Sequence, residues 1–175
     1  NKEKYKEAKK RHISPLVEES IEIGAGADHL IATVISKYYE DEFISVNVKD
    51  EWFHFNGVRW ERTLEGTNLR MKIHKEISLL YAGYYKDYVT QSINNPNDEN
   101  CKRNLKNIQE IQIKLLKDSY VSVLMNSLRN LFYKKEIMEK FDTDTSLLGF
   151  ENGIYDLKNN EFRKGIPEDY ITMST

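Results

Sequence analysis

The sequence predicts an α+β protein that is mainly α-helical, a helical bundle decorated by two short β-hairpins. Three observations predict this class. Apolar residues recur at helical spacing along most of the chain, an Asn-Gly pair near residue 56 lies between aromatic residues, and a second turn-rich pattern occupies the C-terminal segment. The 175 residues, of which 39% are hydrophobic and 31% charged, suffice for a folded core.

Composition excludes several classes of protein. A formal net charge of -2 excludes a protein that coats nucleic acid through bulk positive charge, although it is compatible with a local basic face. The single cysteine, Cys101, excludes an internal disulfide framework and a cysteine-rich zinc module. No apolar run is long enough to span a membrane, which favours a soluble intracellular protein. The chain begins with Asn1 and not with Met, so we expect a fragment of a longer protein.

Residues 1–27 form a basic segment that precedes the main domain, which we place at residues 28–175. Residues 2–11 hold six basic and two acidic side chains. A basic arm that reaches a phosphate backbone is one interpretation of this charge. A basic linker or a solvated helix from a preceding region is the other, and it is the one that we favour.

Residues 28–48 predict a helix and then a strand. Asp28 is a suitable N-cap, and apolar residues at helical spacing continue through about Tyr39. Apolar residues then alternate from Phe43 to Val48, which is typical of a strand.

The first hairpin is predicted over residues 52–60. Asn56 and Gly57 readily adopt the two positive φ angles of a type I′ turn, and apolar residues lie on both sides of them. The aromatic side chains Trp52, Phe55 and Trp60 could stack on nucleic-acid bases. A hairpin with so many aromatic rings more typically packs them against a hydrophobic core.

A helical pattern resumes after Gly66. One apolar stripe consists of Leu69, Ile73, Ile77, Leu80 and Tyr84. A polar loop at residues 90–100 follows, and it predicts an internal boundary. We therefore divide the domain into a helix–hairpin–helix part at 28–92 and a helical part at 98–175 that ends in a hairpin.

A long amphipathic helix is predicted over residues 98–118, and it carries the candidate nucleic-acid-binding residues. On a helical wheel, four cations fall on one face: Arg103, Lys106, Lys114 and Lys117. Their spacing suits successive phosphates, although Glu110 lies among them and a merely solvated face is the alternative. Further helical turns are predicted over 120–130 and 131–140.

The sequence offers no catalytic constellation, so we expect the chain itself to be non-catalytic and without a bound cofactor. No Gly-Lys pair occurs, which excludes a phosphate-binding P-loop, and the four histidines lack the spacing of a zinc site. The pair Asp142 and Asp144 resembles paired metal-binding aspartates, but it follows a helical run and predicts a helix-ending loop with no metal site.

The C-terminal segment predicts the second hairpin and carries a resemblance. The run from Leu148 to Leu157, with Glu161-Phe162-Arg163 and Pro167-Glu168-Asp169-Tyr170-Ile171 after it, resembles the region upstream of the ATPase in poxvirus-type and phage/plasmid-type primase-helicases. The Trp52–Trp60 hairpin followed by a long helical part resembles that family too. Richness in Asn and Lys is similar to large nucleocytoplasmic DNA viruses such as the mimivirus group.

The resemblance implies a role in DNA replication. In that family a primase domain precedes this region and a superfamily 3 helicase follows, so the resemblance places the primase aspartates before Asn1 and the Walker motifs beyond Thr175. The chain would be a non-catalytic linking or collar domain that supports a hexameric ring and guides single-stranded or forked DNA to the motor. ATP and Mg²⁺ would belong to the parent protein, which would meet other replication proteins, but no membrane, in a viral factory of the host cytoplasm.

Five residues match the family's pattern and are expected to be structural, not catalytic: Asn152, Gly153, Asp156, Pro167 and Asp169. The Asn-Gly pair and the proline look like turn-forming residues, and Asp156 looks like a turn or cap acceptor. An alternative function is a protein-interaction module that docks a replication partner without touching nucleic acid. The net charge and Glu110 favour that alternative.

Overall fold

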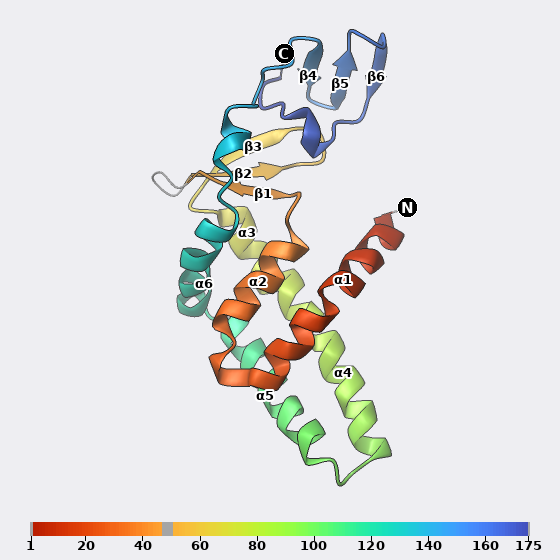
Figure 1. Cartoon of the computed structure of the whole chain (residues 1–175), viewed down its shortest axis with the longest axis vertical. Coiled ribbons are helices and arrows are strands. Elements are labelled where there is room, and N and C mark those ends of the chain that lie inside the picture. Colours follow the sequence, from red (N-terminus) through yellow and green to blue (C-terminus); the bar gives the residue numbers. More distant parts are fainter. Residues whose placement is uncertain (1, 47–50, 175) are drawn as a thin grey trace. The chain divides into compact units, whose positions relative to one another are not determined.

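The computed structural model describes residues 2–46 and 51–174 of the chain. It confirms an α+β fold that is mainly helical, with two small antiparallel sheets (Figure 1). The chain divides into two compact units, each formed by two separate segments. Unit 1 consists of Asn1–Tyr38 and Leu69–Leu131, and unit 2 consists of Tyr39–Asn68 and Phe132–Thr175.

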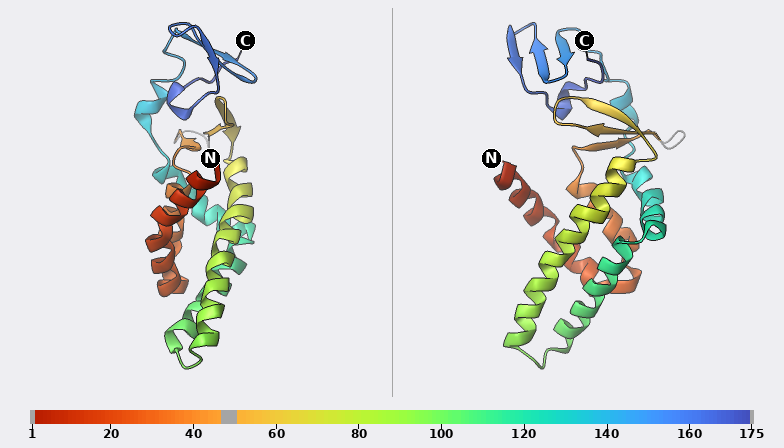
Figure 2. Two further views of the ribbon diagram at one scale, coloured as in Figure 1. Left: turned by 90° about the vertical axis from the view of Figure 1, so that its right-hand side faces the viewer. Right: turned by 180° about the vertical axis from the view of Figure 1, so that it is seen from behind.

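The helices lie mostly in unit 1. In chain order the helical elements are α1 (Lys2–Ile23), η1 (Gly24–Gly26), α2 (Asp28–Tyr38), α3 (Thr67–Lys72), the π-helical turn η2 (Ile73–Ile77), α4 (Ser78–Asn94), α5 (Glu99–Leu115), α6 (Asp118–Leu131), the short α7 (Lys135–Met138) and η3 (Pro167–Asp169). Helices α4 and α5 lie side by side along their length (Figure 2). The predicted helix over 120–130 is α6, whereas within the predicted 131–140 only Leu131, the last residue of α6, and the four residues of α7 are helical.

The basic N-terminal segment is part of the bundle. Helix α1 packs against α2 and α5, and its side chains Ile13, Val17 and Ile21 are fully buried. Its basic residue Lys9 donates from Nζ to the carbonyl oxygen of Tyr38 at 3.1 Å. Burial of this apolar stripe, at roughly 25 cal/mol per Å² of apolar surface, holds the segment on the bundle.

The core of unit 1 departs from the predicted stripe at a π-helical turn. Leu69, Ile73 and Ile77 are fully buried as predicted, but the next buried residue is Tyr81. Leu80 and Tyr84, which the regular 3.6-residue period selects, are only half-buried. The π turn at Ile73–Ile77 takes more residues per turn than an α-helix, so every later position rotates around the axis.

The predicted boundary at 90–100 does not separate the two units. Helix α4 continues to Asn94, and α5 begins at Glu99 with the carboxylate of Asp98 accepting from the backbone N–H of Cys101 at 3.0 Å. This N-cap satisfies a backbone donor that a helix start leaves free. The loop is therefore a short connection between two packed helices of unit 1.

Unit 2 holds two three-stranded antiparallel sheets. The first has the order β1 (Phe43–Ser45), β2 (Glu51–Phe55), β3 (Trp60–Leu64), and the second has the order β4 (Leu147–Phe150), β5 (Gly153–Asp156), β6 (Glu161–Arg163). Both predicted hairpins are present, and each gains a third strand. All three residues of β1 are buried, so the predicted alternation is wrong for Phe43–Ser45; Asn47 and Val48 lie outside the described residues.

Candidate nucleic-acid interface

Two of the four predicted cations lie exposed on α5. Arg103 and Lys106 are one helical turn apart, and within the described residues no ion pair engages either side chain. Glu110, one turn further along, is exposed as well and reduces the local positive charge. This part of the predicted basic face is therefore small.

Lys114 is half-exposed and is engaged by two residues of neighbouring helices. Its Nζ lies 3.6 Å from Oδ1 of Asp28 and 5.1 Å from the centre of the Tyr120 ring. The hydroxyl of Tyr120 donates to the same Asp28 oxygen at 2.7 Å. Burial and this hydrogen bond to a carboxylate raise the pKa of Tyr120 well above its usual range. Asp28 is the first residue of α2 and not its N-cap as predicted, because the carbonyl of Ala27 accepts the first helical hydrogen bond, from the N–H of Ile31. Its carboxylate instead links α2 to α5 and α6.

Lys117 lies beyond the end of α5, so the prediction that it shares the helical face is wrong. The helix ends at Leu115, and the N–H of Lys117 donates to the carbonyl of Lys114 at 2.9 Å. The ring of His74 lies at this helix end, with Nδ1 2.8 Å from the carbonyl oxygen of Leu115 and Nε2 3.0 Å from Oδ1 of Asp118. His74 thus satisfies a terminal carbonyl at the point where α5 ends and the chain turns into α6.

The turn of the first hairpin differs from the predicted type I′. Phe55 pairs with Trp60, and the N–H of Asn56 donates to the carbonyl of Arg59 at 3.0 Å, so the central residues are Gly57 and Val58. Of these, only Gly57 has a positive φ, at 99°. A glycine at the first central position is typical of a type II′ turn. Oδ1 of Asn56 accepts from the N–H groups of Val58 (2.8 Å) and Arg59 (3.0 Å), which stabilises the turn.

The aromatic residues of the first hairpin cover a core, as favoured from the sequence. Trp52 and Trp60 are 1% and 3% exposed, and the ring of Phe55 packs 5.5 Å from that of Trp60. The ring faces of the two tryptophans are therefore not available to a base, whereas Phe55 is half-buried.

In the second sheet, Gly153 is a strand residue and not a turn residue. The β4–β5 loop consists of Glu151 and Asn152, and Gly153 opens β5 opposite Phe150. A Cβ at Gly153 would lie 2.6 Å from the ring of Phe162 and 2.8 Å from the carbonyl oxygen of Arg163. The glycine is required for this close approach, and the prediction that it sets the turn is wrong.

Asp156 acts as the predicted turn acceptor. Its carboxylate accepts from the N–H groups of Lys158 (2.9 Å) and Asn159 (3.2 Å) and from the Asn159 amide (2.8 Å). These hydrogen bonds, the side-chain amide foremost, lower the pKa of Asp156. They hold the connection from β5 to β6.

Pro167 and Asp169 form the short helix η3. Pro167 occupies its first position, where a missing N–H has no cost. The Asp169 carboxylate accepts from the N–H of Ile166 at 2.9 Å and from both terminal nitrogens of Arg163 at 2.8 and 2.7 Å. This bidentate pair raises the pKa of Arg163. Both residues thus make local contacts that hold η3 and the end of the second sheet.

The pair Asp142 and Asp144 lies in a loop, as predicted. Asp142 accepts from the N–H of Thr172 at 2.8 Å and from its hydroxyl, whereas Asp144 accepts from the N–H and hydroxyl of Ser146 at 3.0 and 2.5 Å. The two carboxylates therefore serve different partners. Within the described ranges, no group of three or more His, Cys, Asp or Glu residues could hold a metal ion.

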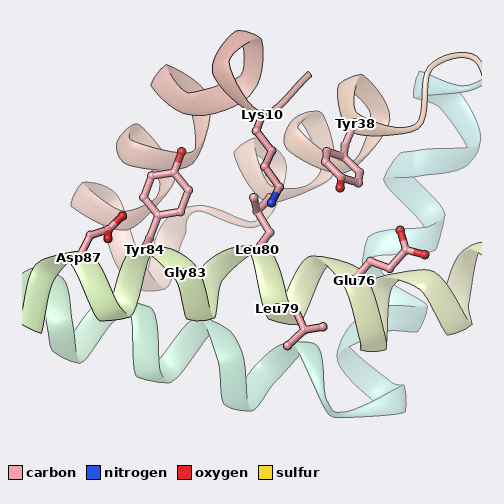
Figure 3. Close-up of a pocket in the computed structure, with 8 residues that line it drawn as sticks. All are labelled: Lys10, Tyr38, Glu76, Leu79, Leu80, Gly83, Tyr84 and Asp87. Carbon is pink, nitrogen blue, oxygen red and sulfur yellow. The ribbon is translucent and has the colours of Figure 1, made fainter. Parts of the chain in front are cut away.

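A groove of about 510 Å³ lies in unit 1 between α1, the end of α2 and α4 (Figure 3). Figure 3 shows Lys10, from the basic segment, extending from α1 toward Leu80. The carboxylates of Glu76 and Asp87 line the same groove. Since two acidic groups accompany the lysine, the groove is not a basic surface.

The second sheet exposes an apolar face that sequence reasoning missed. We call the following residues the aromatic face, because strand alternation places their side chains on one side of the sheet: Leu148, Phe150, Tyr155, Leu157 and Phe162. Leu148, Leu157 and Phe162 are 40%, 52% and 49% exposed. Only the strand register reveals this face.

Fold and surface together define a mainly helical α+β domain with a small basic patch and an exposed aromatic face. Within residues 2–46 and 51–174, no helix has the length and apolar character needed to cross a membrane. A family model described as D5 N terminal like matches residues 32–175. The chain belongs to this family, the N-terminal region of primase-helicase proteins of large DNA viruses, which confirms the resemblance found in the sequence.

Viral proteins with helicase names are similar to the chain. L207/L206 of Acanthamoeba polyphaga mimivirus is 26% identical over 177 residues, covering 99% of this chain and 18% of that protein. The 022R protein of Frog virus 3 is 26% identical over 180 residues, covering 84% of this chain and 18% of that protein. The 184R protein of Invertebrate iridescent virus 6 is 26% identical over 177 residues, with 83% and 18% covered. The chain thus spans about a fifth of the length of these relatives, each of which is named a putative helicase.

Proposed function

We propose that the chain is a non-catalytic linking or collar domain of a viral DNA-replication primase-helicase. It supports ring assembly and guides single-stranded DNA to the ATPase motor. The observation that carries the proposal is the family match over residues 32–175, together with helicase-named relatives that are several times longer than the chain.

The surface of unit 1 supports a guiding role. Arg103 and Lys106 project from one stretch of α5 and are exposed, so they can meet neighbouring phosphates of a flexible strand. Lys114 contributes less, because Asp28 and Tyr120 already engage it. A contact by two or three cations is weak, which suits a strand that must slide.

The parent protein supplies the chemistry in this proposal. ATP and Mg²⁺ bind at its motor, and the motor forms a hexameric ring on single-stranded or forked DNA with other replication proteins. The proposed place of action is a viral factory in the host cytoplasm.

Charge reversal tests the guiding role. We expect the double variant Arg103→Glu, Lys106→Glu to weaken binding of single-stranded DNA and to reduce the slope of log affinity against log salt by about 0.7 for each lost phosphate contact. Lys86→Glu is the matched control, since Lys86 is exposed on α4 of the same unit. Unchanged affinity and slope in the double variant, with intact folding, would remove α5 from the DNA path.

A protein-interaction module is the second candidate. Ile113 on α5 and Leu116, the residue after its end, are 56% and 64% exposed, so a partner that covered them would remove large apolar side chains from water. If α5 docks a replication partner, Ile113→Ser should weaken that complex, whereas reversal of Arg103 and Lys106 should leave DNA affinity unchanged.

A further inference from the structure

Charge is distributed unevenly along the chain. Residues 2–11, which open helix α1, hold six basic and two acidic side chains, and we call them the basic arm. Their net charge of +4 stands in a chain whose total is -2, so the rest of the chain carries -6. A polyanion is therefore attracted to the basic arm, while the average charge of the remainder repels it.

The order of charges within α1 is the reverse of the one that helix stability favours. The partial charges at helix ends favour acidic side chains in the first turn and basic side chains in the last turn. Helix α1 instead begins with lysines, has no basic residue in its last turn, and carries Glu18, Glu19 and Glu22 near its end. Helix stability therefore does not account for the basic arm.

The basic arm is continuous with a helix that is anchored in the bundle. Among the described side chains of α1, the first buried one is Ile13, directly after the arm. Lys9 is half-buried and donates to the carbonyl oxygen of Tyr38 at the end of α2. Cations held on an anchored helix lose less conformational freedom on binding than cations of a flexible tail. The described side chains of the arm that remain exposed are Lys4, Glu7, Ala8, Lys10 and Arg11.

Lys4 and Arg11 share one face of the basic arm. They are seven residues apart, which is about two helical turns, or about 10 Å along the axis. Glu7 lies between them, about one turn from each, and reduces the positive charge of this face. Lys10 is exposed as well, but it lines the groove of Figure 3 together with two carboxylates. The arm therefore offers a few phosphate contacts and not a dense basic patch.

We propose that the basic arm binds the phosphate backbone of DNA. The inference rests on the proposed guiding function for its ligand, and it adds a contact at residues that precede the family match at 32–175. Because lysine and arginine contacts to phosphates carry no sequence information, the arm binds DNA of any sequence.

This contact is separate from the one proposed for α5. The side-chain amide of Asn107, which follows Lys106, donates to the carbonyl oxygen of Ile21 at 2.8 Å. Ile21 is ten residues from Arg11, about 15 Å along α1. Each of the two contacts can therefore be removed without the other.

A gain of affinity tests the basic arm most sharply. Glu7→Lys removes the acidic side chain between Lys4 and Arg11 and adds a cation. We expect it to bind labelled oligothymidylate of about 20 nucleotides on the order of five-fold more tightly, and to make the slope of log affinity against log salt more negative by about 0.7.

Glu19→Lys is the matched control for this gain. It makes the same change of charge at an exposed position of the same helix, about 18 Å from Glu7. This distance exceeds the screening length of about 10 Å at about 0.1 M salt, so we expect its affinity to be unchanged there.

A loss of affinity tests the same face. We expect the double variant Lys4→Glu, Arg11→Glu to bind more weakly, with a slope that is shallower by about 0.7 for each lost contact. Lys4→Gln, Arg11→Gln repeats the test with uncharged, good helix-forming residues if circular dichroism shows that charge reversal unfolds the start of α1.

The outcomes separate the two proposals. Equal affinities of Glu7→Lys and Glu19→Lys, or full affinity after loss of both arm cations, overturn the basic arm; binding that still depends on Arg103 and Lys106 would keep the guiding function. Polyglutamate that displaces the oligonucleotide at equal concentration of charge would overturn DNA as the ligand in favour of an acidic protein. The absence of any binding at low salt would overturn both proposals.

Discussion

The indole N–H of Trp60 donates to the carbonyl oxygen of Pro167 at 2.9 Å, across 107 positions of sequence. The backbone N–H of Trp60 also donates to the carbonyl of Ile171 at 2.8 Å. Trp60 begins β3 of the first sheet, and Pro167 begins η3 after the second. The two segments that carry the family resemblance therefore meet at one tryptophan inside unit 2.

Loss of this contact should destabilise unit 2. Trp60→Phe removes the indole donor and leaves the Pro167 carbonyl without its partner, so we expect the free energy of unfolding to fall by about 1–3 kcal/mol. Urea denaturation followed by fluorescence of Trp52 measures the change. The control variant is Trp52→Phe, whose unfolding is followed by the fluorescence of Trp60. It makes the same indole-to-phenyl change at another buried site. Equal effects in the two variants would mean that the hydrogen bond to Pro167 contributes nothing.

Two glycine-to-alanine variants should have opposite effects. Gly153→Ala brings a Cβ against Phe162 and the Arg163 carbonyl, and we expect a loss of about 1–3 kcal/mol. Gly83→Ala, in the middle of α4, meets nothing within 4 Å, and alanine is the better helix former, so we expect a gain of about 0.5–1 kcal/mol. Thermal unfolding by circular dichroism measures both. A neutral Gly153→Ala would contradict the close packing described for the second sheet.

Acid should destabilise unit 2 through two aspartates. The amide of Asn159 and backbone N–H groups lower the pKa of Asp156, and the hydroxyl and N–H of Ser146 lower that of Asp144. A lowered folded-state pKa gives stability that is complete above the unfolded value of about 4 and is lost as pH falls toward the folded value. Tryptophan fluorescence reports unit 2, which holds both tryptophans. Asp156→Asn should make the stability of unit 2 less dependent on pH below about pH 4. An unchanged dependence of stability on pH would contradict the role given to Asp156.

Alkali should destabilise unit 1 through Tyr81. Burial raises the pKa of this tyrosine far above its usual value of about 10, although the Ser20 hydroxyl, 2.7 Å away, acts in the opposite direction. A raised folded-state pKa gives stability that is complete below the unfolded value and is lost as pH rises through the folded one. We therefore expect helical circular dichroism to become more sensitive to urea above about pH 10, and less so in Tyr81→Phe. Equal sensitivity of the two proteins would exclude Tyr81 as the cause.

Local patterns predicted most of the elements. The apolar period of α5 and α6 depends only on neighbouring residues, so both helices were predicted within a few positions. The π turn at Ile73–Ile77 has no such signature, and it moved Tyr81 into the core in place of Leu80. The pairing of β1 with β2 and the two-segment units depend on contacts distant in sequence, which a local pattern does not contain.

The candidate site was harder to predict than the fold. A helical wheel places Lys117 beside Arg103 only if the helix continues, and His74, from a distant segment, satisfies the carbonyl at which it stops. A helical wheel of α5 also contains no information on Asp28, a residue of α2 whose carboxylate pairs with Lys114. The aromatic face requires the register of three strands, because Leu148 and Phe162 become neighbours of Tyr155 only through pairing.

A fluorescence-anisotropy titration of the chain with labelled single-stranded DNA, at low and moderate salt, tests the central claim most directly. The account predicts binding at low salt that weakens linearly on a log–log plot, with a slope of about -0.7 for each phosphate contact and a small number of contacts in total. Failure to bind at low salt would contradict a DNA-guiding domain and leave the protein-docking role of α5.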